Sequence, residues 1–300
     1  MAQREEEEVM ARVVVQRPDW GDFACKWGSY WLQEVINEAR THGYDVSDLH
    51  ANNARREKVL RECKKSDFVY FSGVGHGNAT TFTGQRGEPI FWLGDQETKQ
   101  ISRGKHFNFL SCKFGRLGAK WMARRGRAVG VHAYTADFIF IADEDDFPNG
   151  YARPFFDSHL TVDRELLKGS THGEAHRACI RRYLYWSMRA PSICRRYLIW
   201  NMIHKAFYGR RWADLRTTRA CIVATATLGY GNEKLEAFHW LRDCVIDRRP
   251  LGKYIIDFYY YMSNLFVDAI FYNERLRRFV YKTIVNPAWV ILEKIRRKDK

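Results

Sequence analysis

The 300-residue sequence lacks the motifs by which proteins bind nucleotides or recognise nucleic acids. It has no P-loop, no glycine-rich phosphate loop after its first predicted strand, no zinc-finger spacing and no aromatic signature of an RNA-binding domain. These absences argue against nucleotide chemistry and against sequence-specific binding of nucleic acid. The hydrophobic fraction of 46% is enough to fill a substantial core, so the chain is predicted to be globular.

Paired cysteines and an export signal are also lacking. The seven cysteines are odd in number, form no C-x-x-C pair and follow no regular spacing, which is typical of a reducing compartment. The chain begins MAQREEEEVMARVVV, which opens with charge and has too short an apolar run for a signal peptide. A cytoplasmic location is therefore expected.

Basic residues outnumber acidic residues by 49 to 35, which gives a net charge of +14. A charge of this sign favours encounters with nucleic acid, anionic membranes or acidic proteins. The excess lies in arginine pairs rather than in one compact run, for example at Arg181-Arg182, Arg195-Arg196, Arg210-Arg211 and Arg277-Arg278. Such pairs are typical of solvated helical faces, with a surface for an anionic partner as the alternative.

Short apolar runs alternate with amphipathic segments along the first part of the chain. Strands are predicted at Ala11 to Val15, Tyr44 to Leu49, Phe68 to Phe71, His106 to Leu110 and Ala128 to Val131. Helices are predicted at Phe23 to Thr41, Asn53 to Cys63, Leu117 to Arg125, Phe155 to Leu167 and Gly173 to Tyr185. Residues 78–100 are expected to form a surface excursion with a hairpin through Pro89 to Leu93. This order predicts an α/β fold: a mostly parallel sheet with helices on both faces.

The pattern changes near Gly209 to Arg219, and the sequence after the last predicted helix is expected to be almost wholly helical. We therefore predict two domains, residues 1–208 and a C-terminal α-helical module at residues 209–300. Within the module, Tyr254 to Tyr272 is strongly apolar but contains Asp257, Asn264 and Asp268, which are costly at the centre of a bilayer. This segment is not predicted to span a membrane.

Two chemically active residues follow successive core strands. His76 lies in the sequence SGVGHG and Cys112 in the sequence SCKFG, each directly after an apolar strand. Taken singly, each residue type is more often structural at such a place. Because the carboxyl ends of parallel strands meet at one edge of a sheet, the two side chains are expected to converge there. A catalytic thiol needs an imidazole that accepts its proton and amide donors for an oxyanion, and the N–H groups of Gly77 and Cys112 are the expected donors.

The segments Phe68 to Gly77 and Phe107 to Gly115, which end in His-Gly and in Ser-Cys-x-x-Gly, resemble the caspase-fold cysteine peptidases of clan CD. Within that group the sequence is most similar to the gingipain, clostripain and CHAT-type branches. Phe155-Phe156 and the run from Gly169 to Ala175 also resemble those branches, so the resemblance covers residues 11–190. The sequence departs from several relatives in lacking an acidic residue before Cys112 and in the bulky Lys113-Phe114 after it.

The resemblance implies a cysteine endopeptidase that hydrolyses protein or peptide substrates through a thioester acyl-enzyme. It implies that His76 is the general base and acid and that Cys112 is the nucleophile. No cofactor is expected, and a calcium requirement is left open. Related enzymes that cut after Arg or Lys hold an acidic residue in the first specificity pocket, for which Asp22 and Asp137 are the candidates. Each could equally be a turn or helix-cap aspartate. Asp143 to Asp146 are expected to form a solvated loop, with a calcium site or a cleavage-controlled segment as the alternatives.

The C-terminal segment Cys221 to Gly229, with Leu241 to Asp243 and Pro250 to Gly252, is similar to a small module known as the CFI box. Cys221 is expected to be a packed small residue, with a reactive role as the alternative. The basic helices of the module would dock a regulatory protein, lie on an anionic membrane, or pack on the peptidase domain. A second hypothesis follows: a catalytically silent caspase-fold scaffold that binds a partner or membrane through these helices. The presence of both His76 and Cys112 argues against it.

Overall fold

The structure is a computed structural model that describes residues 10–21, 23–143, 145, 147–148, 150–215, 227–228, 234, 238, 241, 269–270 and 273–298. The chain divides into two compact units, Met1–Thr218 and Arg219–Lys300. The domain boundary between residues 208 and 209 stays a prediction. Cys221 and most of the segments that are similar to the CFI box lie outside the described residues.

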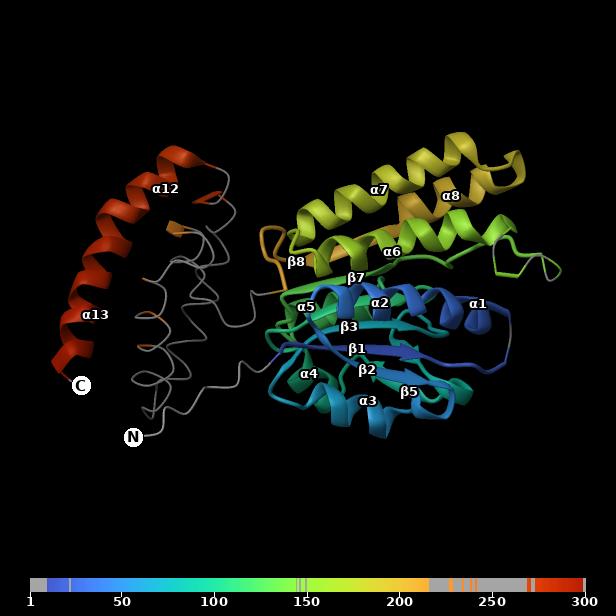
Figure 1. The fold of residues 1–300 in the computed structure, drawn as a ribbon, viewed down its shortest axis with the longest axis horizontal. Helices are drawn as coiled ribbons and strands as arrows, with labels where there is room; N and C mark the ends of the chain where they lie inside the picture. The colour runs from blue at the N-terminus through green and yellow to red at the C-terminus, as the bar shows by residue number, and fades with distance from the viewer. Residues whose placement is uncertain are drawn as a thin grey trace. The chain divides into compact units, whose positions relative to one another are not determined.

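A six-stranded sheet forms the centre of the first unit, in the order β2-β1-β3-β6-β7-β8 (Figure 1). Its strands are β1 (Arg12–Arg17), β2 (Asp45–His50), β3 (Phe68–Val74), β6 (His106–Leu110), β7 (Gly130–Tyr134) and β8 (Lys205–Gly209). All neighbours are parallel except β8, which is antiparallel to β7. Every residue of β3 and β6 is buried, as expected for parallel strands covered on both faces. The predicted α/β fold with a mostly parallel sheet is confirmed.

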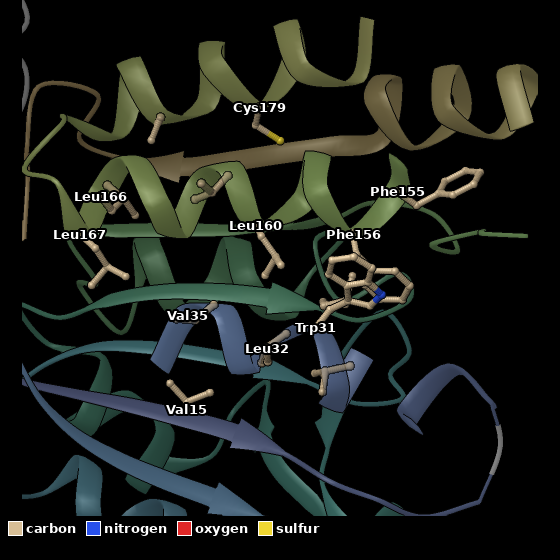
Figure 2. Packing of buried hydrophobic residues seen from close by; sticks show 14 of the residues in the cluster. Val15, Trp31, Leu32, Val35, Phe155, Phe156, Leu160, Leu166, Leu167 and Cys179 are labelled. Carbon is tan, nitrogen blue, oxygen red and sulfur yellow. The ribbon is translucent and has the colours of Figure 1, made fainter. Parts of the chain in front are cut away.

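Helices lie on both sides of this sheet. One side carries α1 (Phe23–Trp31), α2 (Gln33–Thr41), α6 (Arg153–Leu167), α7 (His172–Arg189) and α8 (Ser192–His204). The other side carries α3 (Arg56–Cys63), α4 (Gln96–Ser102) and α5 (Gly118–Arg124). Figure 2 shows the first side, where Trp31 and Val35 pack in one core with Phe156 and Leu160 of α6. The helix predicted over residues 23–41 is present and is interrupted at Leu32.

Residues 78–100 contain a hairpin, as predicted, but its aromatic side chains are not part of a surface excursion. β4 (Thr81–Thr83) and β5 (Pro89–Trp92) form an antiparallel hairpin whose Phe82 and Phe91 are fully buried. Both rings contact Phe71 of the sheet, with centroids 6.1 and 5.1 Å away. Burial of two aromatic rings therefore outweighs the polar composition of the segment.

The chain after α7 was predicted to be almost wholly helical. This prediction was wrong for Lys205–Gly209, which form the strand β8. This short strand adds an antiparallel edge to β7. Its first residue, Lys205, is buried, donates to Asn108 Oδ1 at 3.1 Å and places its ammonium over the Tyr134 ring at 4.6 Å. Burial lowers the pKa of Lys205 to about 8. A buried lysine interrupts the apolar pattern by which a strand is detected in the sequence.

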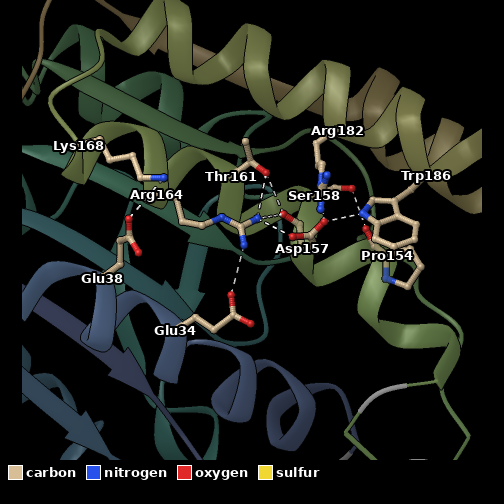
Figure 3. Close-up of polar contacts among 10 residues, drawn as sticks. All are labelled: Glu34, Glu38, Pro154, Asp157, Ser158, Thr161, Arg164, Lys168, Arg182 and Trp186. Atoms are coloured by element: carbon tan, nitrogen blue, oxygen red, sulfur yellow. Dashed lines mark hydrogen bonds and ion pairs between the residues drawn. The ribbon is translucent and has the colours of Figure 1, made fainter. Parts of the chain in front are cut away.

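Polar contacts fasten α6 to the helices around it (Figure 3). The Asp157 carboxylate accepts hydrogen bonds from Arg164 at 2.7 Å, from Arg182, and from the Trp186 indole at 2.5 Å. Arg164 also reaches Glu34 of α2 at 3.3 Å. Burial alone would raise the pKa of Asp157, but the bonds from Arg182 and Trp186 and the charge of Arg164 bring it below its usual value. The carboxylate therefore stays ionised and ties α6 to α7.

In the second unit the structure describes α12 (Glu274–Val280), a π-helical turn (Tyr281–Val285) and α13 (Asn286–Lys298). These segments are helical, as predicted for this part of the chain. Among all residues that the structure describes, we find no helix with the length and apolar content of a membrane span.

Candidate active site

His76 and Cys112 leave the sheet from neighbouring strands. β3 and β6 are parallel partners, and their last residues, Val74 and Leu110, lie opposite each other in the ladder. His76 follows Val74 by two residues, and Cys112 follows Leu110 by two residues. The Gly75 N–H donates to the Leu110 carbonyl at 3.1 Å, which continues the pairing beyond both strands. The strand order thus brings the two loops to the same edge of the sheet.

The two loops touch at Gly77. A Cβ atom at this position would lie 2.0 Å from Ser111 Oγ and 3.1 Å from the Cys112 carbonyl oxygen. A larger residue would therefore displace the loop that carries Cys112. The His76 carbonyl accepts hydrogen bonds from the Thr83 N–H at 2.9 Å and from Thr83 Oγ1 at 3.0 Å. The buried hairpin β4–β5 thereby holds the main chain of His76.

The two backbone amides predicted to bind an oxyanion are not used by the fold. Within the part of the chain that the structure describes, the N–H groups of Gly77 and Cys112 donate no hydrogen bond. The antiparallel bridge between Gly77 and Phe82 is made by the neighbouring amides of Asn78 and Thr83. Uncommitted amides beside a thiol are the donors that a developing oxyanion requires.

A small cavity that is partly open to solvent lies over these loops. His76, Ser111 and Cys112 line it together. Most of the remaining wall is apolar and comes from the strand ends, the segment after β7, and α6: Val74, Leu110, Phe138, Phe140 and Phe156. An imidazole and a thiol that are distant in the chain therefore share one recess with a largely apolar wall.

Cys112 is the most accessible of the cysteines that the structure describes. It is partly exposed, whereas four others are buried: Cys25, Cys63, Cys179 and Cys194. Burial raises the pKa of the Cys112 thiol above its usual value, and the Asp137 carboxylate raises it further. The Phe138 N–H and the Lys113 ammonium act in the opposite direction without cancelling the rise. At neutral pH the resting group is the thiol, so nucleophilic attack requires a base that takes its proton.

Asp137 lies in the segment that follows β7, beside this thiol. Its carboxylate pairs with Lys113 Nζ at 2.9 Å, and the two side chains are 47% and 44% exposed. Lys113 has a left-handed backbone conformation with φ of 60°, and its N–H donates to the Ala136 carbonyl at 3.0 Å. Asp137 is not one of the residues that line the cavity. The candidate specificity acid is thus near the nucleophile but already paired with a lysine of the chain.

Asn201, which the sequence did not lead us to expect, holds this segment in place. Its buried side chain accepts from the Ile139 N–H at 3.0 Å and donates to the Ile139 carbonyl at 2.7 Å. The Trp200 indole donates to the Asp137 carbonyl at 2.9 Å. One sequence signal was available: an asparagine within the apolar run from Tyr197 to Ile203 indicates a buried amide that needs partners.

The other candidate acidic residues add no site within the described residues. Asp22 lies outside them, as do Glu144 and Asp146 of the acidic loop. The Asp145 N–H donates to Asp143 Oδ1 at 3.2 Å in an exposed turn. Over the described ranges, no three histidine, cysteine, aspartate or glutamate side chains are grouped so that they could hold a metal ion. A calcium site in this loop stays a prediction.

No family model and no curated protein matches the chain. Among solved structures, the complex of the pro- and mature domains of RgpB from Porphyromonas gingivalis matches with a TM-score of 0.48 and 9% identity, over 69% of this chain and 49% of that chain. The Arg-specific cysteine proteinase gingipain R (RGPB) matches with a TM-score of 0.46 and 12% identity, over 69% of this chain and 48% of that chain. The chain spans about half the length of these two solved chains, to which it is similar.

Proposed function

We propose that the chain is a cysteine peptidase in which His76 and Cys112 form the catalytic dyad. One observation carries this proposal: the two side chains line the same cavity at the carboxyl ends of adjacent parallel strands. Parallel sheets bind ligands at this edge. An imidazole beside a thiol provides the base and the nucleophile that nucleophilic catalysis at a carbonyl requires. Two uncommitted amides next to the thiol support the same chemistry.

The proposed reaction begins with the Cys112 thiol, because burial raises the pKa of this group. The His76 imidazole takes the proton as the sulfur attacks the carbonyl carbon of the scissile peptide bond. The Gly77 and Cys112 N–H groups donate to the oxyanion of the tetrahedral intermediate. His76 then protonates the leaving amine, and a thioester remains on Cys112. Water, deprotonated by His76, attacks the thioester and releases the carboxylic acid and the thiol.

A preference for Arg or Lys at the P1 position, which the resemblance implies, would have to rest on Asp137. The Asp137 carboxylate stands beside the Cys112 thiol, and this position favours a basic P1 residue. A substrate cation would, however, have to replace the Lys113 ammonium as the partner of Asp137. Asp22 adds no support, because it lies outside the described residues.

The test is cleavage of a peptide library by the full chain and by three variants. We expect Cys112→Ala and His76→Ala to lose about 10³-fold or more in rate, because neither partner of a dyad acts alone. Cys63→Ala removes a buried thiol that does not line the cavity and serves as the matched control. Cleavage by Cys112→Ala at the wild-type rate would refute the assignment of the nucleophile.

A second candidate is the catalytically silent scaffold, favoured by the surface of α12 and α13. Phe279, which follows the arginine pair Arg277-Arg278 directly, is 61% exposed there, and Ile291 of α13 is 59% exposed. Exposed apolar side chains beside cations fit a regulatory protein or an anionic membrane. Binding to such a partner without Cys112-dependent cleavage of any library peptide would favour the scaffold. A cytoplasmic location and a role for the C-terminal module stay predictions.

A further inference from the structure

We infer that the cavity beside Cys112 is a specificity pocket for an apolar side chain, so that the substrate carries an aliphatic or aromatic residue at P1 rather than Arg or Lys. This inference rests on the proposed peptidase function and concerns its substrate class. It is carried by one juxtaposition: among the residues that the structure describes, which do not include Asp22, the thiol shares its cavity with aliphatic and aromatic side chains and with no acidic side chain.

The wall is built from four parts of the fold. Val74 and Leu110, the last residues of β3 and β6, come from the sheet. Phe138 and Phe140 come from the segment after β7, and Phe156 comes from α6. The first residues of α1 complete it with Ala24 and Cys25. Apart from His76, Ser111 and the thiols of Cys25 and Cys112, the described lining residues therefore offer a substrate no polar side chain.

The aromatic part of the wall is fixed by its packing. Phe156 stacks on Trp31 (Figure 2), and the ring centroids are 6.0 Å apart with planes 7° from parallel. Phe138 and Phe140 lie 5.8 and 5.0 Å from Phe156. Trp27 contacts Phe140 from the side of α1 at 6.3 Å. Such rings keep their positions without a ligand, so the pocket is preformed for apolar contact.

The backbone that carries two of these rings is also fixed. The Asn201 side chain holds both the N–H and the carbonyl of Ile139, the residue between Phe138 and Phe140. A Cβ atom on Gly28 of α1 would lie 2.4 Å from Val74 Cγ2, which shows how closely this helix approaches the strand ends. The pocket is thus bounded by a fixed helix and a fixed segment.

A substrate cation would find no charge partner among the described residues that line this pocket. Asp137 does not line it, and its carboxylate is occupied by Lys113 at 2.9 Å on a half-exposed surface. A guanidinium or ammonium that enters an apolar recess loses water without gaining a carboxylate, which disfavours it strongly. An aliphatic or aromatic side chain gains the burial of its surface instead.

The experiment uses the full chain and irreversible thiol-directed peptide probes that differ only at P1: Leu, Phe, Ala, Lys, Arg and Asp. Labelling of Cys112 is followed by mass spectrometry as a second-order rate. We expect the Leu or Phe probe to label at least about tenfold faster than the Arg, Lys and Asp probes, and faster than Ala, because apolar pockets discriminate by the surface that they bury. Faster labelling by Arg or Lys would overturn the inference and leave the peptidase proposal intact. Absence of Cys112 labelling by every probe would overturn both.

Two variants make the result specific to the pocket. Phe140→Asp places a carboxylate in the wall at a partly exposed position, and we expect it to shift the preference towards Lys and Arg. Phe147→Asp is the matched control, because Phe147 also contacts Trp27 but does not line the cavity. We expect it to keep the wild-type rank order of probes. In Asp137→Asn the rank order should also persist. If the Asp137→Asn variant, and no other variant, lost labelling of Cys112 by the Arg probe, the P1 specificity would be assigned to Asp137 and the apolar pocket would be refuted.

Discussion

The Lys113 ammonium lies 2.9 Å from the Asp137 carboxylate, and this ion pair stands beside the Cys112 thiol. The two charges act on the thiol in opposite directions: Asp137 disfavours the thiolate and Lys113 favours it. Because both side chains are nearly half exposed, their direct effect on stability is small. The measurable effect of these two charges is the one on the reactivity of the Cys112 thiol.

Asp137→Asn should make the Cys112 thiol more reactive below its pKa. The substitution removes a negative charge that raises the pKa, so the thiolate fraction at pH 7 increases. Lys113→Ala should have the opposite effect, because it removes a cation that lowers the pKa. We expect rate changes of up to about tenfold in each direction, the change that one pKa unit produces. The measurement is the pH dependence of iodoacetamide labelling of Cys112. Equal pH profiles for both variants and wild type would show that the ion pair does not act on the thiol.

Gly77→Ala should inactivate the proposed enzyme, and adding Ser111→Ala should restore part of the activity. The new Cβ atom would lie 2.0 Å from Ser111 Oγ, so the loop that carries Cys112 must move. A displacement of about 1 Å near reacting groups costs about 10²-fold in rate. Ser111 Oγ is buried and bonded to no group in the described residues, so its removal costs little and opens the space that the new methyl group needs. The measurement is cleavage or Cys112 labelling by the two single variants and the double variant. A double variant no better than Gly77→Ala would contradict the proposed clash.

The strand-end positions of His76 and Cys112 could be predicted, because both depend on patterns within one segment. β3 and β6 are apolar on both faces, and the rule that ligands bind at the carboxyl ends of parallel strands then places both residues at one edge. β8 could not be predicted, because its buried Lys205 is compensated by Asn108, a partner 97 residues away. The burial of Phe82 in the predicted hairpin was missed for the same reason, since it depends on Phe71 of another strand.

The lining of the cavity was beyond prediction from sequence. Phe138, Phe140 and Phe156 meet only because Asn201 fixes one segment and Trp31 stacks on one ring. Side-chain direction in an irregular segment follows from such contacts and leaves no periodic pattern. The resemblance that suggested a basic P1 residue made Asp137 a candidate specificity acid. It gave no indication that the Asp137 carboxylate is already paired with the Lys113 ammonium.

Asn201→Leu should loosen the segment beside the thiol. The substitution removes two hydrogen bonds and leaves the N–H and carbonyl of Ile139 without partners next to an apolar side chain. We expect a loss of about 2 kcal/mol in the free energy of unfolding, since each unpaired backbone group costs about 1–3 kcal/mol and Ile139 is only partly buried. Urea denaturation measures the loss, and limited proteolysis should detect new cleavage near residues 137–143. Trp200→Phe, which removes only the bond to the Asp137 carbonyl, is the milder control. Wild-type stability of Asn201→Leu would show that the two bonds do not hold the segment.

The protein should lose stability steeply in mild acid because of a buried chain of histidines. His106 Nδ1 lies 2.8 Å from His172 Nε2, and His172 Nδ1 lies 3.0 Å from His132 Nε2. Burial lowers the pKa of all three, in His172 from 6.5 to about 3. Below pH 6.5 the unfolded chain therefore takes up protons that the folded chain does not bind. The stability is complete above pH 6.5 and falls as the pH drops towards 3, by about 1.4 kcal/mol per pH unit for each histidine.

His172→Gln should reduce this slope by the contribution of one histidine, even if the variant is less stable at every pH. The measurement is the free energy of unfolding in urea between pH 7.5 and 5, well above the pKa of His172 in the folded state. Phe207→Leu is the matched control, because its ring lies 5.3 Å from that of His172 and carries no proton. It should lower the stability equally across the pH range and leave the slope unchanged. A slope as steep in His172→Gln as in the wild type would mean that the acid sensitivity comes from other groups.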